Sequence, residues 1–170
     1  MRWWQHVRVV HILLAAASLL LLSGCGGEPD AAPSALPPYP STLSDASTPT
    51  EVAQVLIAAL DAKDTETLTA LVAAQHAADD IDQIYESHGR SHETSPEKAA
   101  HTLVAGWLLS YAWFDPGRTR VVSERIQGQT AVVQAEGMNP NTGHTRTLII
   151  ELVREDGVWK VIGGLKSREP

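Results

Sequence analysis

Three glutamates in the second half of the chain and one histidine near its middle have side chains suited to proton transfer. They are Glu124, Glu136, Glu151 and His76. Glu124 and Glu151 alternate with apolar residues, as they would on strands. If such a face lined an apolar cavity, desolvation would shift the pKa of the group and suit it to general-base chemistry. If the face met water, the group would be an ordinary surface acid. The solvated alternative is favoured, so Glu124, Glu151 and His76 stay weak candidates and no catalytic residue is assigned.

A histidine group formed by His88, His92 and His101 is the best candidate for metal binding. His88 and His92 are four residues apart, which is the spacing of two ligands on one helical face. Gly89 and Pro96 indicate a loop here, so the helical argument does not hold. We therefore expect a solvated polar loop, with no metal and no other cofactor.

Aromatic residues cluster between positions 107 and 114. Trp107 and Tyr111 are four residues apart on one helical face, which favours a place in the core. Trp113 and Phe114 follow at the end of the same segment, beside a turn, where aromatic side chains can act as recognition anchors. Core packing is the favoured interpretation, and all four residues are candidates for lining a ligand pocket.

The N-terminus has the layout of a secretory signal. It begins with two arginines and no acid, and the apolar run at 9–22 follows. A run of 14 residues is too short to span a bilayer, which takes about 20 residues. Cys25 is the only cysteine, which excludes an internal disulfide framework and a zinc site built from thiolates.

The junction Leu22-Ser23-Gly24-Cys25 resembles the lipobox of bacterial lipoproteins. In that family the thiol receives a diacylglycerol, and a signal peptidase cuts just before the cysteine. The resemblance implies cleavage between Gly24 and Cys25, lipidation of Cys25 and an extracytoplasmic domain. The anchor would lie in the cell membrane, or in the outer membrane where one exists. No second apolar run of 18 residues exists, so this lipid is the only membrane contact that we expect.

The rest of the chain divides into a tether and one domain. Residues 25–48 are rich in proline and serine and have no apolar period, which predicts a disordered tether after the acylated cysteine. The domain is expected at 49–166, because Thr48-Pro49-Thr50-Glu51 is a capping box with proline at the first helical position. Helical spacing continues to residue 111, and a two-residue period follows Gly117. Helices followed by four strands predict an α+β fold with an antiparallel sheet.

Two stretches of the chain resemble the nuclear transport factor 2-like superfamily. They are the helix, acidic break and second helix at 52–72 and the hairpin at 152–162. Several uncharacterised families of small bacterial lipoproteins look similar. The resemblance implies N-terminal helices packed on a curved four-stranded antiparallel sheet that forms a cone with a cavity. The long helix that ends near Trp113 and the acidic segment at 75–94 depart from this pattern.

Charge and motifs narrow the function classes. Twenty acids against 13 bases give a net charge of −7, which argues against nucleic-acid binding. The sequence contains neither a phosphate-binding glycine loop nor a nucleophile elbow. We expect a non-catalytic module that binds a small hydrophobic ligand or an envelope protein. The alternative is an enzyme resembling ketosteroid isomerases or dehydratases, with a buried carboxylate in the cone. The superfamily also implies a homodimer formed through the sheet.

Overall fold

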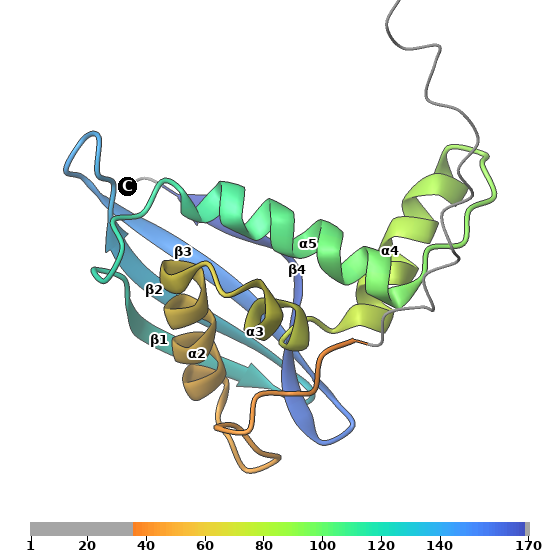
Figure 1. The fold of residues 1–170 in the computed structure, drawn as a ribbon, viewed down its shortest axis with the longest axis horizontal. Coiled ribbons are helices and arrows are strands. Elements are labelled where there is room, and N and C mark those ends of the chain that lie inside the picture. Colours follow the sequence, from red (N-terminus) through yellow and green to blue (C-terminus); the bar gives the residue numbers. More distant parts are fainter. Residues whose placement is uncertain (1–35, 169–170) are drawn as a thin grey trace, which may run out of the picture. The chain divides into compact units, whose positions relative to one another are not determined.

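The computed structural model describes residues 36–168, in which four helices precede a four-stranded antiparallel sheet (Figure 1). This arrangement confirms the predicted α+β class. The signal segment, the Gly24–Cys25 cleavage site, the lipidated Cys25 and the start of the tether lie outside the described residues. Within the described part, no helix combines the length and the apolar character needed to cross a membrane.

The first described helix starts at the predicted capping box. Thr48 Oγ1 accepts the Glu51 N–H at 3.2 Å, and Glu51 Oε2 accepts the Thr48 N–H at 2.7 Å. Asp64 and Ser95 cap two later helices in the same way, because their side-chain oxygens satisfy N–H groups that have no partner in the first turn. The helices are α2 (Pro49–Ala62), α3 (Thr65–Ala70), α4 (Ala74–Ser87) and α5 (Pro96–Tyr111).

The sheet follows the chain, with strand order β1-β2-β3-β4 and antiparallel neighbours. The strands are β1 (Arg120–Gln127), β2 (Thr130–Met138), β3 (Thr145–Glu155) and β4 (Val158–Arg168). β4 runs through Gly163 to Arg168, because Gly163 adopts a φ of 64° at an irregularity in the pairing with β3 and the strand then resumes.

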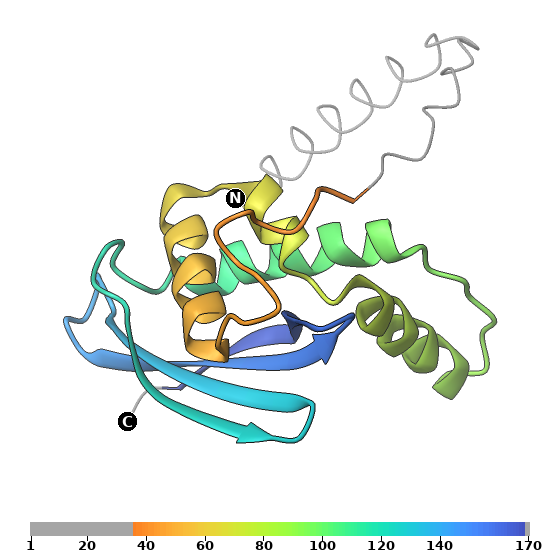
Figure 2. The ribbon, with the colours of Figure 1, turned by 90° about the horizontal axis from the view of Figure 1, so that it is seen from below.

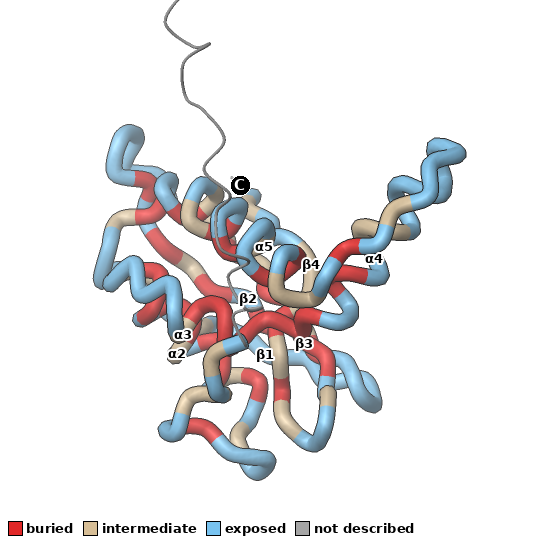
Figure 3. Tube along the Cα trace, turned by 45° about the vertical axis from the view of Figure 1, so that its right-hand side comes forward, coloured by how far each residue is buried: buried red, intermediate tan, exposed pale blue. Residues whose placement is uncertain are grey.

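Helices α2 and α5 pack on one face of the sheet, and α3 packs on these two helices (Figure 2). Alternate residues of β2 and β3 point into this interface and are buried, and Figure 3 shows the alternation as red and paler segments. The fully buried set includes Leu56 of α2, Trp107 of α5, and Leu148, Ile150 and Leu152 of β3. Each such aliphatic side chain stabilises the fold by about 1.5–3 kcal/mol. The interface is therefore filled by the protein's own side chains.

Residues 39–47 contact the domain, whereas the sequence predicts a disordered tether up to residue 48. Tyr39 Oη donates a hydrogen bond to the Trp159 carbonyl at 2.7 Å, and only 9% of Leu43 is exposed. Arg154 Nη2 also donates to the Asp45 carbonyl at 3.0 Å. The proline-rich composition of this segment does not indicate that Tyr39 and Leu43 pack on the domain. The packed structure therefore begins before α2.

No helix within residues 36–168 covers the opposite face of the sheet (Figure 2). Its middle carries Val132, Ile149 and Ile162, which are half-buried, and an ion pair between Lys166 Nζ and Glu151 Oε1 at 2.6 Å. Glu151 lies between Val132 and Ile162 in the strand register, so apolar and charged side chains alternate on this surface. It is the surface through which the predicted homodimer would form.

Candidate binding groove

The outer side of α5 changes from polar to apolar along the helix. In the first half it carries Glu97, Lys98, His101 and Thr102, whereas the second half and the next residues carry apolar side chains. The buried side is continuous, from Ala99 to Tyr111. One hollow borders the first half of α5, and another borders its second half.

An open groove of about 710 Å³ borders the second half of α5. α2 contributes Leu60 at its C-terminal end, and most of the other lining comes from α5, the turn after it and the β2–β3 loop. The main apolar contributors are Leu108, Leu109, Tyr111, Phe114, Pro116 and Pro140. Such a concave and mainly apolar surface with few polar groups has the composition of a site for a hydrophobic ligand.

Asp61 fixes the wall of this apolar groove. Tyr111 Oη donates to Asp61 Oδ1 at 2.8 Å, and the Gly117 N–H donates to Asp61 Oδ2 at 3.1 Å. The Thr119 hydroxyl lies 3.0 Å from Tyr111 Oη. Burial raises the pKa of Tyr111 far above its usual value, and the bond to Asp61 adds to the rise while Thr119 opposes it. Both carboxylate oxygens of Asp61 thus hold α5 and the following turn against α2.

Phe114 is positioned by packing against Tyr111 and against β2. Its ring stacks on that of Tyr111, with centroids 5.3 Å apart and planes inclined by 12°. A Cβ on Gly137 would lie 2.7 Å from Phe114 Cδ1 and 2.6 Å from Thr119 Oγ1. Only glycine therefore lets the ring approach β2 this closely.

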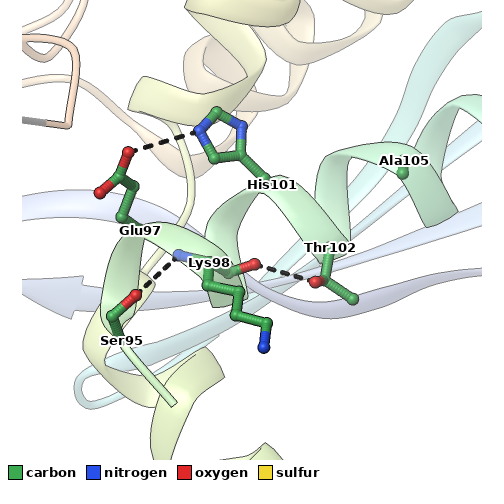
Figure 4. Close-up of a pocket in the computed structure, with 6 residues that line it drawn as sticks. All are labelled: Ser95, Glu97, Lys98, His101, Thr102 and Ala105. Carbon is green, nitrogen blue, oxygen red and sulfur yellow. Dashed lines mark hydrogen bonds and ion pairs between the residues drawn. The ribbon is translucent and has the colours of Figure 1, made fainter. Parts of the chain in front are cut away.

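A second hollow, of about 590 Å³, borders the first half of α5 (Figure 4). Its polar groups already interact within the same helix. Ser95 Oγ accepts the Lys98 N–H at 3.2 Å, Thr102 Oγ1 donates to the Lys98 carbonyl at 2.8 Å, and His101 Nε2 lies 3.9 Å from Glu97 Oε1. These are ordinary contacts between residues three or four positions apart, so this surface offers no convergent binding chemistry.

Glu124 and Glu151, the two strand glutamates among the weak general-base candidates, do not lie in a cavity. Glu124 is exposed on β1, where its Oε2 accepts the Thr50 N–H at 2.8 Å and caps the start of α2. A bulge between Val121 and Ser123 shifts the register before it. Glu151 lies on the uncovered face and pairs with Lys166. Both carboxylates have structural partners.

Glu136 and His76 are also outside the interface between helices and sheet. Glu136 borders an open hollow with Arg118 and Arg120. His76 is on α4, and its Nδ1 lies 3.4 Å from Glu155 Oε1, while the other oxygen of Glu155 accepts from Lys160 at 2.7 Å. In residues 36–168, the buried polar side chains are Thr69, Thr94 and Asn139, and no carboxylate or histidine is among them.

The three clustered histidines are spread over different contacts. His88 Nδ1 lies 2.7 Å from the Ile84 carbonyl, and the His92 ring lies 4.3 Å from that of Tyr85. His101 faces Glu97 on α5. Within the described range, no three His, Cys, Asp or Glu side chains come together as a metal site.

The four aromatic candidates divide into three environments. Tyr111 and Phe114 line the groove. Trp107 is fully buried in the core, where its Nε1–H donates to the Gly163 carbonyl at 2.9 Å. Trp113 is 51% exposed, with the guanidinium of Arg146 5.7 Å from its ring. Trp107 therefore lies in the core, which was the favoured interpretation, and neither Trp107 nor Trp113 lines the groove.

Sequence reasoning missed Asp61. It is 50 residues from Tyr111, and in the sequence it looks like the acidic break that ends a helix. Only the packing of α2 against α5 brings the two side chains together. The position of Asp61 at the end of an apolar helix is a local signal in the sequence. This signal does not identify Tyr111 as the hydrogen-bond partner.

No family model matches the chain, and neither a curated protein nor a solved structure is significantly similar to it. The class defined by the fold and the groove is an α+β protein with a helical layer on one antiparallel sheet and an apolar groove beside α5.

Proposed function

We propose that this chain is a membrane-anchored lipoprotein whose domain binds an apolar ligand, or an apolar segment of an envelope protein, in the groove beside α5. Gly24 and Cys25 are the proposed cleavage site, and Cys25 is the proposed lipidated residue. We further propose that the domain is nuclear transport factor 2-like. The helix, break and helix of α2 and α3 followed by four antiparallel strands support this relationship.

The apolar lining of the groove is the observation that carries the binding role. Leu109 is 74% exposed at its border, and an exposed leucine of this kind would lose contact with water when a ligand is bound. Asp61 and Lys63 are the charged residues of the lining, and both oxygens of Asp61 are already engaged. The site thus offers apolar area and little chemistry.

The alternative of an enzyme resembling ketosteroid isomerases has less support. It needs a carboxylate or a histidine in an apolar cavity, and Glu124, Glu151 and His76 all lie on the surface with polar partners. The uncovered face of the sheet offers a surface for a second role, a homodimer, because half-buried Val132, Ile149 and Ile162 lie on it beside the Glu151–Lys166 ion pair. Sedimentation of the purified chain would test this role.

Binding in the groove can be tested with a neutral fluorescent naphthylamine probe. Leu109→Asp places a charge in the apolar lining and should weaken probe binding about tenfold. Thr102→Asp is the matched control, because it lies seven residues earlier on the same helix, beside the polar hollow. Equal probe affinities of the two variants would contradict the proposal that the probe binds in the groove. Both variants should melt like the parent chain.

Lipidation can be tested by labelling cells that express the chain with an alkyne fatty acid. The parent chain should be labelled and shortened to a form that begins at Cys25. Cys25→Ser should give an unlabelled precursor of full length. A variant that is still processed and still labelled would exclude Cys25 as the anchor.

A further inference from the structure

Charge is distributed unevenly between two ends of the described domain. The acidic end, residues 74–98, contains six acids and two bases. The basic end, residues 112–120, 136–146 and 168, contains four arginines against Asp115 and Glu136. Figures 1 and 2 both place α4 at one end of the domain and the turn after α5, together with the β2–β3 loop, at the other. A protein with a net charge of −7 therefore presents one cationic end.

Side chains of the basic end form a continuous surface. The guanidinium of Arg146 lies 5.7 Å from the ring of Trp113. Arg118 Nη1 lies 3.6 Å from Met138 Sδ, and these two residues share an open hollow of about 420 Å³ with Arg120. The cationic groups are thus interleaved with apolar ones, although they come from three separate segments of the chain.

Large apolar side chains project from this surface. The exposed fractions are 51% for Trp113, 74% for Leu109 one turn earlier, and 37% for Met138. Indole rings favour the interface between headgroups and acyl chains, because the ring is apolar and its N–H can still be hydrated. Nearby arginines can meet phosphate groups in the same plane.

Three acids reduce the positive charge of the four arginines at the basic end: Asp115, Glu136 and Asp61, whose Oδ2 accepts the Gly117 N–H at 3.1 Å. Asp115 Oδ2 lies 3.1 Å from Arg118 Nε. Glu136 is opposite Arg120 in the register of β1 and β2, but no ion pair joins them in the described structure. Arg120 is therefore available to an external anion.

We propose that the basic end binds the anionic phospholipid headgroups of the bilayer, with Trp113 and Leu109 in the headgroup region. This inference rests on the proposed lipid anchor, which would hold the domain close to a membrane. Anionic lipids attract the arginines and repel the acidic end, so the charge distribution orients the domain with α4 away from the bilayer. The lipid on Cys25 would supply attachment, and the basic end would supply orientation.

The test uses the full chain mixed with vesicles of brominated phosphatidylcholine, with or without phosphatidylglycerol. Bromine quenches nearby indoles, and subtracting the signal of the Trp113→Phe variant isolates Trp113. We expect quenching of Trp113 with phosphatidylglycerol and loss of that quenching in 1 M salt, which screens charges beyond about 3 Å. The double variant Arg118→Glu/Arg120→Glu should need at least about tenfold more lipid for half-maximal quenching.

The matched control is Arg90→Glu/Lys98→Glu, which makes the same charge change at the acidic end. It should keep the parent lipid dependence. An unquenched Trp113, equal quenching without phosphatidylglycerol, or equal loss in both double variants would each overturn the proposal. Failure of the anchor has a different signature. In that case 1 M salt releases the whole chain from the vesicles, although Trp113 is still quenched at low salt.

Discussion

The two halves of α5 share one buried side and differ on the other. In the first half, the polar side chains of Ser95, Thr102, His101 and Glu97 contact neighbours three or four residues away. In the second half, apolar outer residues continue into the turn and the β2–β3 loop and form a groove. This comparison shows that the buried side of a helix does not indicate where the helix borders a groove. The residues on its outer side and the loops beside them determine the position of the groove.

The largest expected effect comes from the side that both halves share. Trp107→Ala should lower the free energy of unfolding by about 3–5 kcal/mol, because it removes a fully buried indole and leaves a cavity. Trp113→Ala is the matched control on the exposed side and should cost less than about 1 kcal/mol. Urea unfolding measures both values. Similar losses of stability in the two variants would mean that the buried side of α5 contributes no more to stability than its exposed side.

A smaller effect is expected at the groove itself. Tyr111→Phe removes the hydroxyl that Asp61 accepts from, and should lower the free energy of unfolding by about 1–2 kcal/mol. In the polar half, Thr102→Val removes a hydroxyl that bonds to the Lys98 carbonyl on the exposed surface, and should change it by less than about 0.5 kcal/mol. The same urea titrations compare the two. A Tyr111→Phe chain as stable as its parent would show that Asp61 does not hold the wall of the groove.

Stability at alkaline pH should also distinguish the apolar half of α5, which contains Tyr111, from the polar half. The pKa of Tyr111 is raised by burial above its unfolded value of 10.0, so the unfolded chain releases this proton first. Stability is complete below pH 10 and falls as the pH rises toward the folded value. Tyr111→Phe should therefore lose less stability between pH 9 and pH 11 than its parent, as the unfolding midpoint in urea would show. Burial also raises the pKa of Tyr39 to about 12, so part of the loss should persist in the variant. An unchanged pH profile would contradict the burial of the Tyr111 hydroxyl.

The smallest effect is expected in the polar half. Glu97→Gln weakens a contact to His101 across 3.9 Å at the surface, and should change the free energy of unfolding by less than about 0.5 kcal/mol. Probe binding in the groove should not change. A change in probe affinity would show that the two hollows are coupled, and the distinction between the halves would need revision.

Local signals predicted the elements well, and the candidate site poorly. The capping box at Thr48 and the change of period after Gly117 each depend on residues a few positions apart, and the structure contains both features. The extension of β4 to Arg168 was missed, because Gly163 interrupts the pattern and its accommodation depends on β3. Tyr39 and Leu43 were missed for a similar reason, since their packing partners are far along the chain.

Hydrophobic period and capping act over one or two turns, so the amino-acid sequence is enough to predict the α+β class, the order of the elements and the ends of most of them. Which carboxylates are structural and where the groove lies depend on contacts between distant parts of the chain. The partners of Glu124 and Asp61 are 74 and 50 residues away, so no local pattern encodes them. The packing of α2 against α5 and β1 brings each pair within hydrogen-bonding distance, and it leaves the outer side of α5 open beside the loops.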